Sequence, residues 1–488
     1  MDSDEEVKEG APCKRKIYCP QLMVLDIGSK SVYAKCKKKM QKAEAEMVFN
    51  ISTMSSSEQN MFAASVIHNF PRKGGNATYG DVVLQYTPQP VPPDTMRIRL
   101  YVAFPSDKKE WYNHMCLQRA GLIGLLVQTF IAIELRNFNS GSSDDLRPYI
   151  PFLDDCWTGQ VAEVPMVERT MTSGAYVSIS EPQFTEMTPS VALLQLDKTA
   201  AELAHEHYLA KYIRGRLSLL GQLDANKLLH LVLLLSPQKE GGAVEKDKME
   251  TILDLSVIKS AAFYHMPAVA SNLHRSLRNV DDGSMPLSDH CLRVANCENG
   301  VYFLKHTKGG VVACYLGAVI HEVGHLFKIP HANSGIMRHR GENIQTFFLP
   351  DKKLNLSFTI KNFAVLQREE KTHILKIKLP HGILLKQIIN SSFDSTTKLL
   401  MTIHPLITHK PREKMCQILY DEDTGVVEVE SGVRYLLYYT DNDVKHVCSF
   451  TEQCMKKRIV LKTRGSPIRA LIVTSEGNFL SVLVTNTS

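Results

Sequence analysis

Residues 321–331 read HEVGHLFKIPH, and the rest of the chain is organised around this stretch. In a helix, residues i and i+4 share one face, so the rings of His321 and His325 can reach the same metal ion, with Glu322 projecting beside them. A third histidine, His331, must return to the ion through a turn at the end of the helix. Three neutral imidazoles with one open position are the ligand set of a catalytic zinc ion, whereas closed structural sites use four protein ligands.

A second signal follows in the sequence SGIM at 334–337. A tight turn that carries a buried Met beneath a histidine cage is typical of metzincin zinc peptidases, and it predicts that Met337 forms the floor of the site. Glu322 is then placed to take a proton from zinc-bound water and to hand it to a leaving amine. The alternative is a buried amphipathic helix whose histidines only form hydrogen bonds in the core, with Met337 filling a gap.

The motif HEVGHLFKIPH followed by SGIM resembles that of a little-characterised eukaryotic family of intracellular zinc metallopeptidases of metzincin type. The resemblance extends from the strand and long helix near 95–136 to about residue 345, but only the zinc motif is specific. It implies an α/β or α+β metzincin-like zinc peptidase core with Zn²⁺ as the cofactor, and it implies no established substrate.

Two positions depart from the metzincin pattern. Lys328 stands where the pattern has Gly three residues before the third His, at a left-handed turn that Gly adopts without cost. A non-Gly residue there costs about 1 kcal/mol, which a fold can absorb; otherwise the turn differs and His331 binds weakly. His339 stands two residues after Met337, where some metzincins have Tyr. It could assist at the oxyanion, bind the metal or be an exposed loop residue, and the exposed residue is favoured.

The composition is that of a globular protein, with 44% hydrophobic and 22% charged residues, and a chain of 488 residues predicts two or three domains. No segment shows the unbroken apolar run of about 20 residues that crosses a bilayer. The nearest, 120–135, is interrupted by Gln128 and is predicted to be a buried helix. We expect no membrane contact.

The start of the chain, MDSDEE, is acidic where a secretory signal is basic and then apolar. The 11 cysteines form no CxxC pair, which predicts reduced thiols. Together these features predict a cytoplasmic protein that is not secreted, with the nucleus as the alternative. Basic clusters at 35–42 and 456–464 could touch nucleic acid, but without interleaved aromatic residues a solvated surface is favoured.

The chain divides into four predicted parts: an acidic disordered tail (1–16), a β-rich region with a long helix (17–150), the zinc peptidase core (151–345) and a β-sandwich domain (346–488). In the β-rich region we predict strands at 46–51, 81–86 and 96–102, the last with one solvated face, and a helix at 108–136 capped by Asp107.

In the core we predict a helix at 200–220, a strand at 228–235 buried on both faces, a helix at 248–264 and the zinc helix at 311–327. His205 and His207 are not expected to share a metal ion, because i and i+2 residues point to different faces of a helix. A strand at 301–306 could be a sheet edge that pairs with the substrate backbone.

After residue 346, short alternating runs separated by turns predict a β-sandwich. The predicted strands lie at 356–360, 374–379, 398–403, 433–439, 459–462, 468–474 and 479–485. No catalytic constellation is present there, so we expect a binding or stabilising module whose partner is a protein or a glycan.

The sequence therefore predicts an intracellular zinc-dependent peptidase that acts on a peptide or protein substrate. Zn²⁺ is held by His321, His325 and His331, and Glu322 is the general base. One alternative is a catalytically inactive binding protein that keeps the peptidase fold, supported by Lys328. The other is a nuclear protease acting on DNA-bound proteins.

Overall fold

The structure is a computed structural model of the whole chain. It describes the residues in the following ranges: 13–17, 22–27, 64–69, 75–79, 82–86, 95–138, 150, 152, 169–170, 176–179, 191–223, 228–236, 247–268, 273–277, 308–341, 344–345, 355–360, 373–378, 391–408, 417–441, 443–463 and 466–485.

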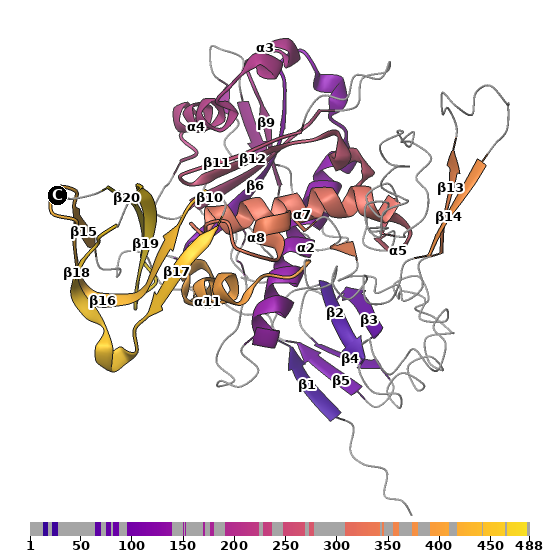
Figure 1. Cartoon of the computed structure of the whole chain (residues 1–488). Helices are drawn as coiled ribbons and strands as arrows, with labels where there is room; N and C mark the ends of the chain where they lie inside the picture. The colour runs from indigo at the N-terminus through magenta and orange to yellow at the C-terminus, as the bar shows by residue number, and fades with distance from the viewer. Residues whose placement is uncertain are drawn as a thin grey trace, which may run out of the picture.

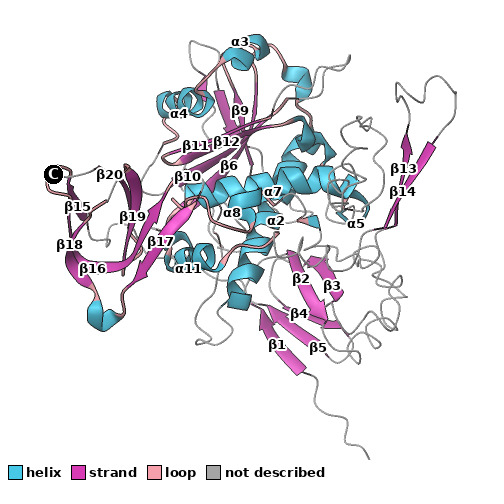
Figure 2. Cartoon of the chain, in the orientation of Figure 1, coloured by secondary structure: helices cyan, strands magenta, loops and turns pink. Residues whose placement is uncertain are grey.

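A seven-stranded sheet forms the centre of the molecule (Figures 1 and 2). Its strand order is β11-β12-β10-β6-β9-β8-β7, and β12, β10, β6 and β9 run parallel to one another. Strand β11 lies antiparallel to β12 at one end, and β8 and β7 are antiparallel at the other. The strands span Lys248–Ile252 (β11), Leu255–Lys259 (β12), Leu228–Leu234 (β10), Arg97–Phe104 (β6), Val191–Gln195 (β9), Tyr176–Ile179 (β8) and Arg169–Thr170 (β7).

The strands predicted at 96–102 and 228–235 are present as β6 and β10, which pair with each other in the middle of the sheet. The predicted solvated face of β6 is wrong, because Arg97 is only 9% exposed and Arg99 only 3%. Alternation along β6 separates two buried faces. Ile98 and Leu100 face one hydrophobic cluster, while Tyr101 and Ala103 face another.

One face of the sheet is covered by two long helices, α2 (His114–Phe138) and α7 (Lys308–Leu326), which cross beneath it in Figure 1. The buried helix predicted at 120–135 is confirmed by α2. Its predicted cap is wrong: the chain first makes a 3₁₀ turn, η2 (Lys109–Trp111), and Asn113 Oδ1 accepts a hydrogen bond from the Cys116 N–H at 3.2 Å. Asp107 instead accepts from the Ala200 N–H, 2.7 Å away, at the start of another helix.

Both long helices contain a stretch that is long and apolar enough to cross a membrane, His114–Ala132 and Gly309–Leu326. However, 78% and 89% of these stretches are buried inside the protein. Helices with that burial are core helices, and the apolar length reflects packing against the sheet and against each other.

The other face of the sheet carries α3 (Ala200–His205) and α4 (Leu209–Leu219), which divide the helix predicted at 200–220 into two. Helix α3 starts with a capping box between Thr199 and Glu202. The apolar side of α4, including Ile213 and Leu217, packs into the cluster beneath it.

The helix predicted at 248–264 is wrong. The segment forms the hairpin β11–β12, followed by the 3₁₀ turn η3 (Ala261–His265) and, further on, the short helix α5 (Leu273–Ser276). Its apolar residues also fit a helical period, but β12 gains a buried place beside β10 in the parallel sheet, and this long-range pairing outweighs local propensity.

Most of the described C-terminal strands form one curled antiparallel sheet of six strands, so the predicted two-sheet sandwich is not confirmed. The long strand β16 (Val426–Tyr439) pairs with β15, β17, β18 and β19, and β19 pairs with β20. The other strands are Ile418–Asp421 (β15), Val444–Ser449 (β17), Lys456–Val460 (β18), Ile468–Thr474 (β19) and Phe479–Val484 (β20), with the 3₁₀ turn η8 at Glu452–Cys454.

One face of this C-terminal sheet joins the central core, because Tyr435, Leu437 and Leu471 belong to the same hydrophobic cluster as α2 and α7. The opposite face closes on its own cluster, which includes Val427 and Ile472. The sheet is therefore packed against the central core.

The strand predicted at 398–403 is wrong, because Ser395–Ile403 forms the helix α11, followed by α12 (Pro405–Thr408). Asp394 caps α11 by accepting a hydrogen bond from the Thr397 N–H at 3.1 Å. The buried carboxylate of Glu134, on α2, accepts from the Phe393 N–H at 2.9 Å and pairs with Lys398 at 3.0 Å. These bonds hold α11 against α2.

The remaining described strands form small sheets. Three belong to one sheet, β1 (Cys13–Ile17), β5 (Val82–Tyr86) and β4 (Gly75–Tyr79), while β2 (Leu22–Ile27) pairs with β3 (Ala64–Asn69) and β13 (Asn355–Ile360) with β14 (His373–Lys378). The strand predicted at 81–86 matches β5. The strands predicted at 46–51 and 301–306 lie outside the described residues, as does most of the predicted tail.

Replacing Asp394 by Ala should lower the free energy of unfolding by about 1 kcal/mol, because α11 loses its N-cap. Chemical denaturation followed by circular dichroism measures the change. Asp423→Ala, in the exposed turn between β15 and β16, is the control and should change stability by less than about 0.5 kcal/mol. Equal effects of the two variants would mean that Asp394 does not cap a helix.

Candidate metal centre

Helix α7 carries the first half of the motif and holds it rigidly. Val312, Leu316, Val319, Ile320 and Val323 are all buried, as predicted, and they pack in the central core. The polar residues of the motif are buried with them: His321 is 2% exposed and Glu322 is 5% exposed. A buried helix fixes the direction in which both side chains leave the backbone.

The three predicted histidines converge on one point. The Nε2 atom of His325 lies 3.0 Å from Nε2 of His321 and 3.2 Å from Nε2 of His331. A tetrahedral zinc ion with Zn–N bonds of about 2.0–2.1 Å separates its ligand nitrogens by roughly 3.3–3.4 Å. Among the described residues, these three form the one group of His, Cys, Asp and Glu side chains that could hold a metal ion.

A hydrogen bond from Nδ1 to a backbone carbonyl orients each imidazole ring. Nδ1 of His321 donates to the carbonyl of Ile336 at 2.9 Å, and Nδ1 of His325 donates to the carbonyl of Ile329 at 2.9 Å. Nδ1 of His331 donates to the carbonyl of Asp441. A proton on Nδ1 leaves the lone pair on Nε2, so three lone pairs face one another.

Burial keeps the imidazoles of His321 and His325 neutral. It lowers the pKa of His321 to about 3, with a further decrease from the neighbouring His325. Burial likewise lowers the pKa of His325 to about 4. Neutral rings with converging lone pairs repel one another unless a cation lies between them. The donor set therefore fits a zinc ion, with three nitrogen ligands and one position left for water or substrate.

Lys328 adopts the left-handed conformation predicted for its position, with φ of 61°. The departure from Gly does not prevent His331 from reaching the other two histidines. The Lys328 ammonium donates to the carbonyl of Leu253, which is itself left-handed with φ of 47° in the turn of the β11–β12 hairpin. A bond that Gly could not form thus ties the third-ligand turn to the sheet.

Met337, which was predicted to form the floor of the site, is fully buried in α8 (Ile336–His339). A Cβ atom added to Gly324 would sit 2.5 Å from the sulfur of Met337, so the end of the Met337 side chain would have to shift to admit it. Seven residues earlier, a Cβ atom on Gly317 would lie 2.4 Å from the carbonyl oxygens of Arg340 and Gly341. Gly317 and Gly324 lie on one face of α7, and because they have no side chain, the segment that carries Met337 (the methionine turn) can pack directly against the helix backbone.

Glu322 is held by the β11–β12 hairpin. Thr251 Oγ1 donates to Glu322 Oε2, and Ser256 Oγ donates to the Glu322 carbonyl at 3.3 Å. Burial raises the pKa of the Glu322 carboxyl, while the bond from Thr251 and the charge of Arg340 lower it. A bound cation would lower it further. One carboxylate oxygen is fixed and the other is left to accept a proton.

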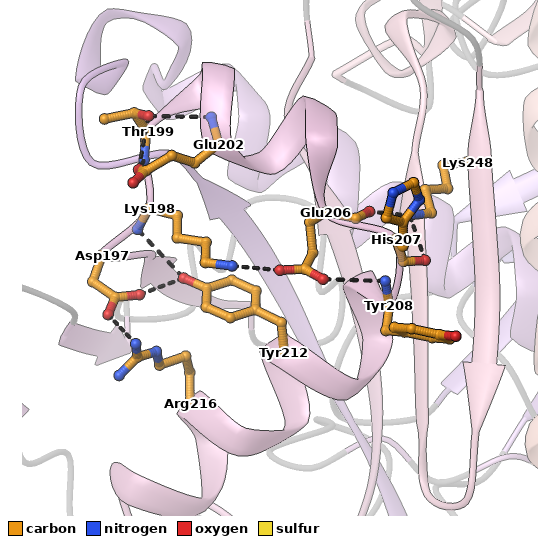
Figure 3. Close-up of polar contacts among 10 residues, drawn as sticks. All are labelled: Asp197, Lys198, Thr199, Glu202, Glu206, His207, Tyr208, Tyr212, Arg216 and Lys248. Atoms are coloured by element: carbon orange, nitrogen blue, oxygen red, sulfur yellow. Dashed lines mark hydrogen bonds and ion pairs between the residues drawn. The ribbon is translucent and has the colours of Figure 1, made fainter.

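Strand β11 is fastened on its far side by the α3–α4 region (Figure 3). The Lys248 ammonium donates to the carbonyls of Glu206 and His207, and the Glu206 carboxylate pairs with Lys198. Glu250 accepts from the Ala210 N–H at 3.2 Å, at the start of α4. The strand that contacts Glu322 through Thr251 is thus also hydrogen-bonded to the α3–α4 region. His207 contributes a carbonyl here, and neither His205 nor His207 belongs to the metal group.

Several residues at the site were not singled out from the sequence. Gly324 carried a signal, since Gly inside a helix often marks a close backbone approach. Thr251 and Asp441 carried none, because their roles depend on pairing between distant segments. Arg340, left-handed with φ of 55°, lies near enough for its charge to affect the pKa of Glu322.

His339 ends α8, and its side chain lies outside the described part of the chain. The basic cluster at 35–42 also lies outside the described residues. The cluster at 456–464 includes the exposed strand β18, where Arg458 pairs with Glu428 at 3.2 Å.

The region that contains the HEVGHLFKIPH motif matches one protein-family model. Residues 302–381 match the family model Metallopep, described as "Putative peptidase family". No curated protein matches the chain. Among solved structures, wild-type OgpA from Akkermansia muciniphila is similar with a TM-score of 0.38 and 10% identity, over 81% of this chain and 96% of that one. Catalytically inactive OgpA from Akkermansia muciniphila, in complex with an O-glycopeptide (glycodrosocin) substrate, is similar with a TM-score of 0.38 and 11% identity. The match covers 81% of this chain and 96% of that one. Scores this low support no inference on fold or substrate.

Purified protein should contain about one zinc ion per chain, measured by elemental analysis, and His325→Ala should lose it because two imidazoles bind zinc weakly. His205→Ala is the matched control, since it removes an exposed histidine from α3, and it should retain the metal. Retention of zinc by His325→Ala would place the metal elsewhere.

Gly324→Ala should displace Met337 and destabilise the protein by about 1–3 kcal/mol through overpacking. Gly215→Ala, in the exposed part of α4 with open space around the added carbon, should instead stabilise the protein by roughly 0.5–1 kcal/mol. Thermal unfolding of both variants beside the wild type measures the contrast. Two glycine variants with the same sign of effect would contradict the packing described here.

Proposed function

We propose that this protein is a zinc-dependent metallopeptidase of metzincin type. The observation that carries the proposal is the convergence of three Nε2 lone pairs beside a buried carboxylate that is held by Thr251. The match of residues 302–381 to a peptidase family model supports the same reaction class.

The proposed roles follow from the positions of the side chains. His321, His325 and His331 hold the metal. A zinc ion bound there lowers the pKa of a water molecule toward neutrality and polarises the scissile carbonyl. Thr251 donates a hydrogen bond to Oε2 of Glu322, so the other carboxylate oxygen takes the proton of the attacking water. Glu322 then transfers this proton to the leaving amine.

The substrate is proposed to be an extended peptide that pairs with β11. This strand ends the seven-stranded sheet in the described part of the chain, and Thr251 connects it directly to Glu322. An extended peptide can add to such an edge as a further strand, which brings one of its carbonyl groups over the metal. The edge predicted from the sequence at 301–306 lies outside the described residues.

The alternative of an inactive binding protein loses its main support from the position of Lys328. The strained turn forms, and His331 reaches the other ligands. Zinc bound at full occupancy, with no cleavage of a diverse peptide library, would still favour a binding role.

Glu322→Gln should lower peptide hydrolysis by about 10²–10⁴-fold while zinc remains bound, because the amide cannot accept the proton. The measurement is cleavage of a diverse peptide library with parallel zinc analysis. Undiminished cleavage, or loss of zinc in this variant, would remove Glu322 from the role of general base.

Thr251→Val should lower hydrolysis by about 10-fold, since it keeps the strand but frees the Glu322 carboxylate. Thr402→Val is the matched control, because its hydroxyl only bonds to the carbonyl of Leu399 within α11. The control should cleave peptides at the wild-type rate.

A further inference from the structure

We propose that the turn between β16 and β17, in which the structure describes residues 440, 441, 443 and 444, is fastened by Asn333 and is a positioning element for the third metal ligand, His331. The inference rests on the proposed zinc site and adds the C-terminal sheet to it. The decisive contact is the bond from His331 Nδ1 to the carbonyl of Asp441, which joins residues 110 positions apart.

The three ligands differ in how they are held. His321 and His325 stand on a buried helix, and their Nδ1 atoms find carbonyls within the motif region, at 336 and 329. His331 lies beyond the end of the helix and is only half-buried. Its ring orientation therefore depends on the carbonyl of Asp441, which lies outside the zinc motif.

Asn333 holds that carbonyl in place. Its side-chain Oδ1 accepts from the Val444 N–H at 3.0 Å, and its Nδ2 donates to the Val444 carbonyl at 3.0 Å. The amide thus pairs with the start of β17 as a neighbouring strand would. Asn333 is two residues from His331, and Val444 is three from Asp441, so the paired bonds fix the distance between ligand and acceptor.

The same turn has further anchors. The Thr440 N–H donates to the Asp443 carbonyl at 2.9 Å, which closes the turn. The Asp443 carboxylate pairs with Lys445 at 3.0 Å and with Arg338 at 3.5 Å. Arg338 belongs to α8, next to Met337. Besides the contact between His331 and Asp441, the loop after α7 is therefore bonded to the turn through Asn333 and Arg338.

A consequence follows for the role of the C-terminal sheet. Partners that orient a metal-bound histidine typically change metal affinity by 10–100-fold when they are lost. Coupling is reciprocal, so metal binding should in turn stabilise the turn at 440–444. The sheet is then part of the metal site and more than an attached module.

Zinc affinity of Asn333→Ala and Asn333→Asp, measured by competition with a chelator, tests the inference. Asp keeps the size of Asn but places a carboxylate oxygen against the Val444 carbonyl. Both variants should bind zinc about 10–100-fold more weakly than the wild type. With Co²⁺ as the probe, the visible absorption spectrum should also change, because His331 is displaced.

Tyr439→Phe is the matched control. It removes one hydrogen bond, between the Tyr439 hydroxyl and Ser481 Oγ at 2.6 Å, in the same sheet. It should leave zinc affinity and the cobalt spectrum unchanged. A general loss of stability in the sheet would affect the control as well, and this would overturn the positioning role.

A second measurement uses the wild-type protein and is independent of variant folding. Removal of zinc by a chelator should speed amide hydrogen exchange at 440–446, while exchange at 426–429, in the other half of β16, stays the same. Equal exchange at 440–446 with and without zinc would overturn the inference. A wild-type protein that binds no zinc would instead refute the proposed function.

Discussion

The structure depends on one electrostatic constraint: the Nε2 atoms of three imidazoles face one another, with Nε2 of His325 3.0 Å from that of His321 and 3.2 Å from that of His331. Without a cation this arrangement is unfavourable, because the converging lone pairs repel one another. The chain maintains it by directing every Nδ1 proton to a backbone carbonyl. The acceptors come from three places: the turn after α7, the methionine turn and the C-terminal sheet. The candidate metal site is thus the point at which three separate segments meet.

The helix α7 makes that meeting possible because it is packed on several sides. Its apolar residues contact the central core, and Gly317 and Gly324 allow the methionine turn to lie directly against its backbone. The hairpin β11–β12 approaches from the sheet and supplies Thr251 to Glu322. A side chain larger than hydrogen at Gly324 would separate the floor of the site from the ligands. The same packing that buries the helix therefore sets the geometry of the ligands.

The parts of the site that could be predicted from sequence are the local ones. His321, Glu322 and His325 follow from the period of a helix, whereas Met337 was predicted from the metzincin pattern that the motif resembles. The same pattern predicted a left-handed turn at Lys328, with a different turn as the alternative. Thr251 could not. It acts on Glu322 only because β11 pairs with β12, and the segment was predicted to be helical.

Dependence on distant segments also explains why some predictions of the fold were wrong. Residues 395–403 contain residues that suit a strand, but the Asp394 cap and a buried apolar face make them a helix held by Glu134 of α2. Arg97 and Arg99 alternate with apolar residues as on a solvated strand, yet β6 lies in the middle of the sheet and both are buried. Alternation distinguishes the two faces of a strand but does not show what covers each face.

Lys328 shows how a departure from a motif can be accommodated by a distant segment. Strain of about 1 kcal/mol at a left-handed non-Gly residue is small against the stability of a domain. The Lys328 ammonium donates a hydrogen bond to the carbonyl of Leu253, in the hairpin that also positions Glu322. Glycine at this position would relieve the strain but remove the connection between the third-ligand turn and the proposed substrate edge. Lys328 therefore adds local backbone strain, but its side chain connects the turn before His331 to the β11–β12 hairpin.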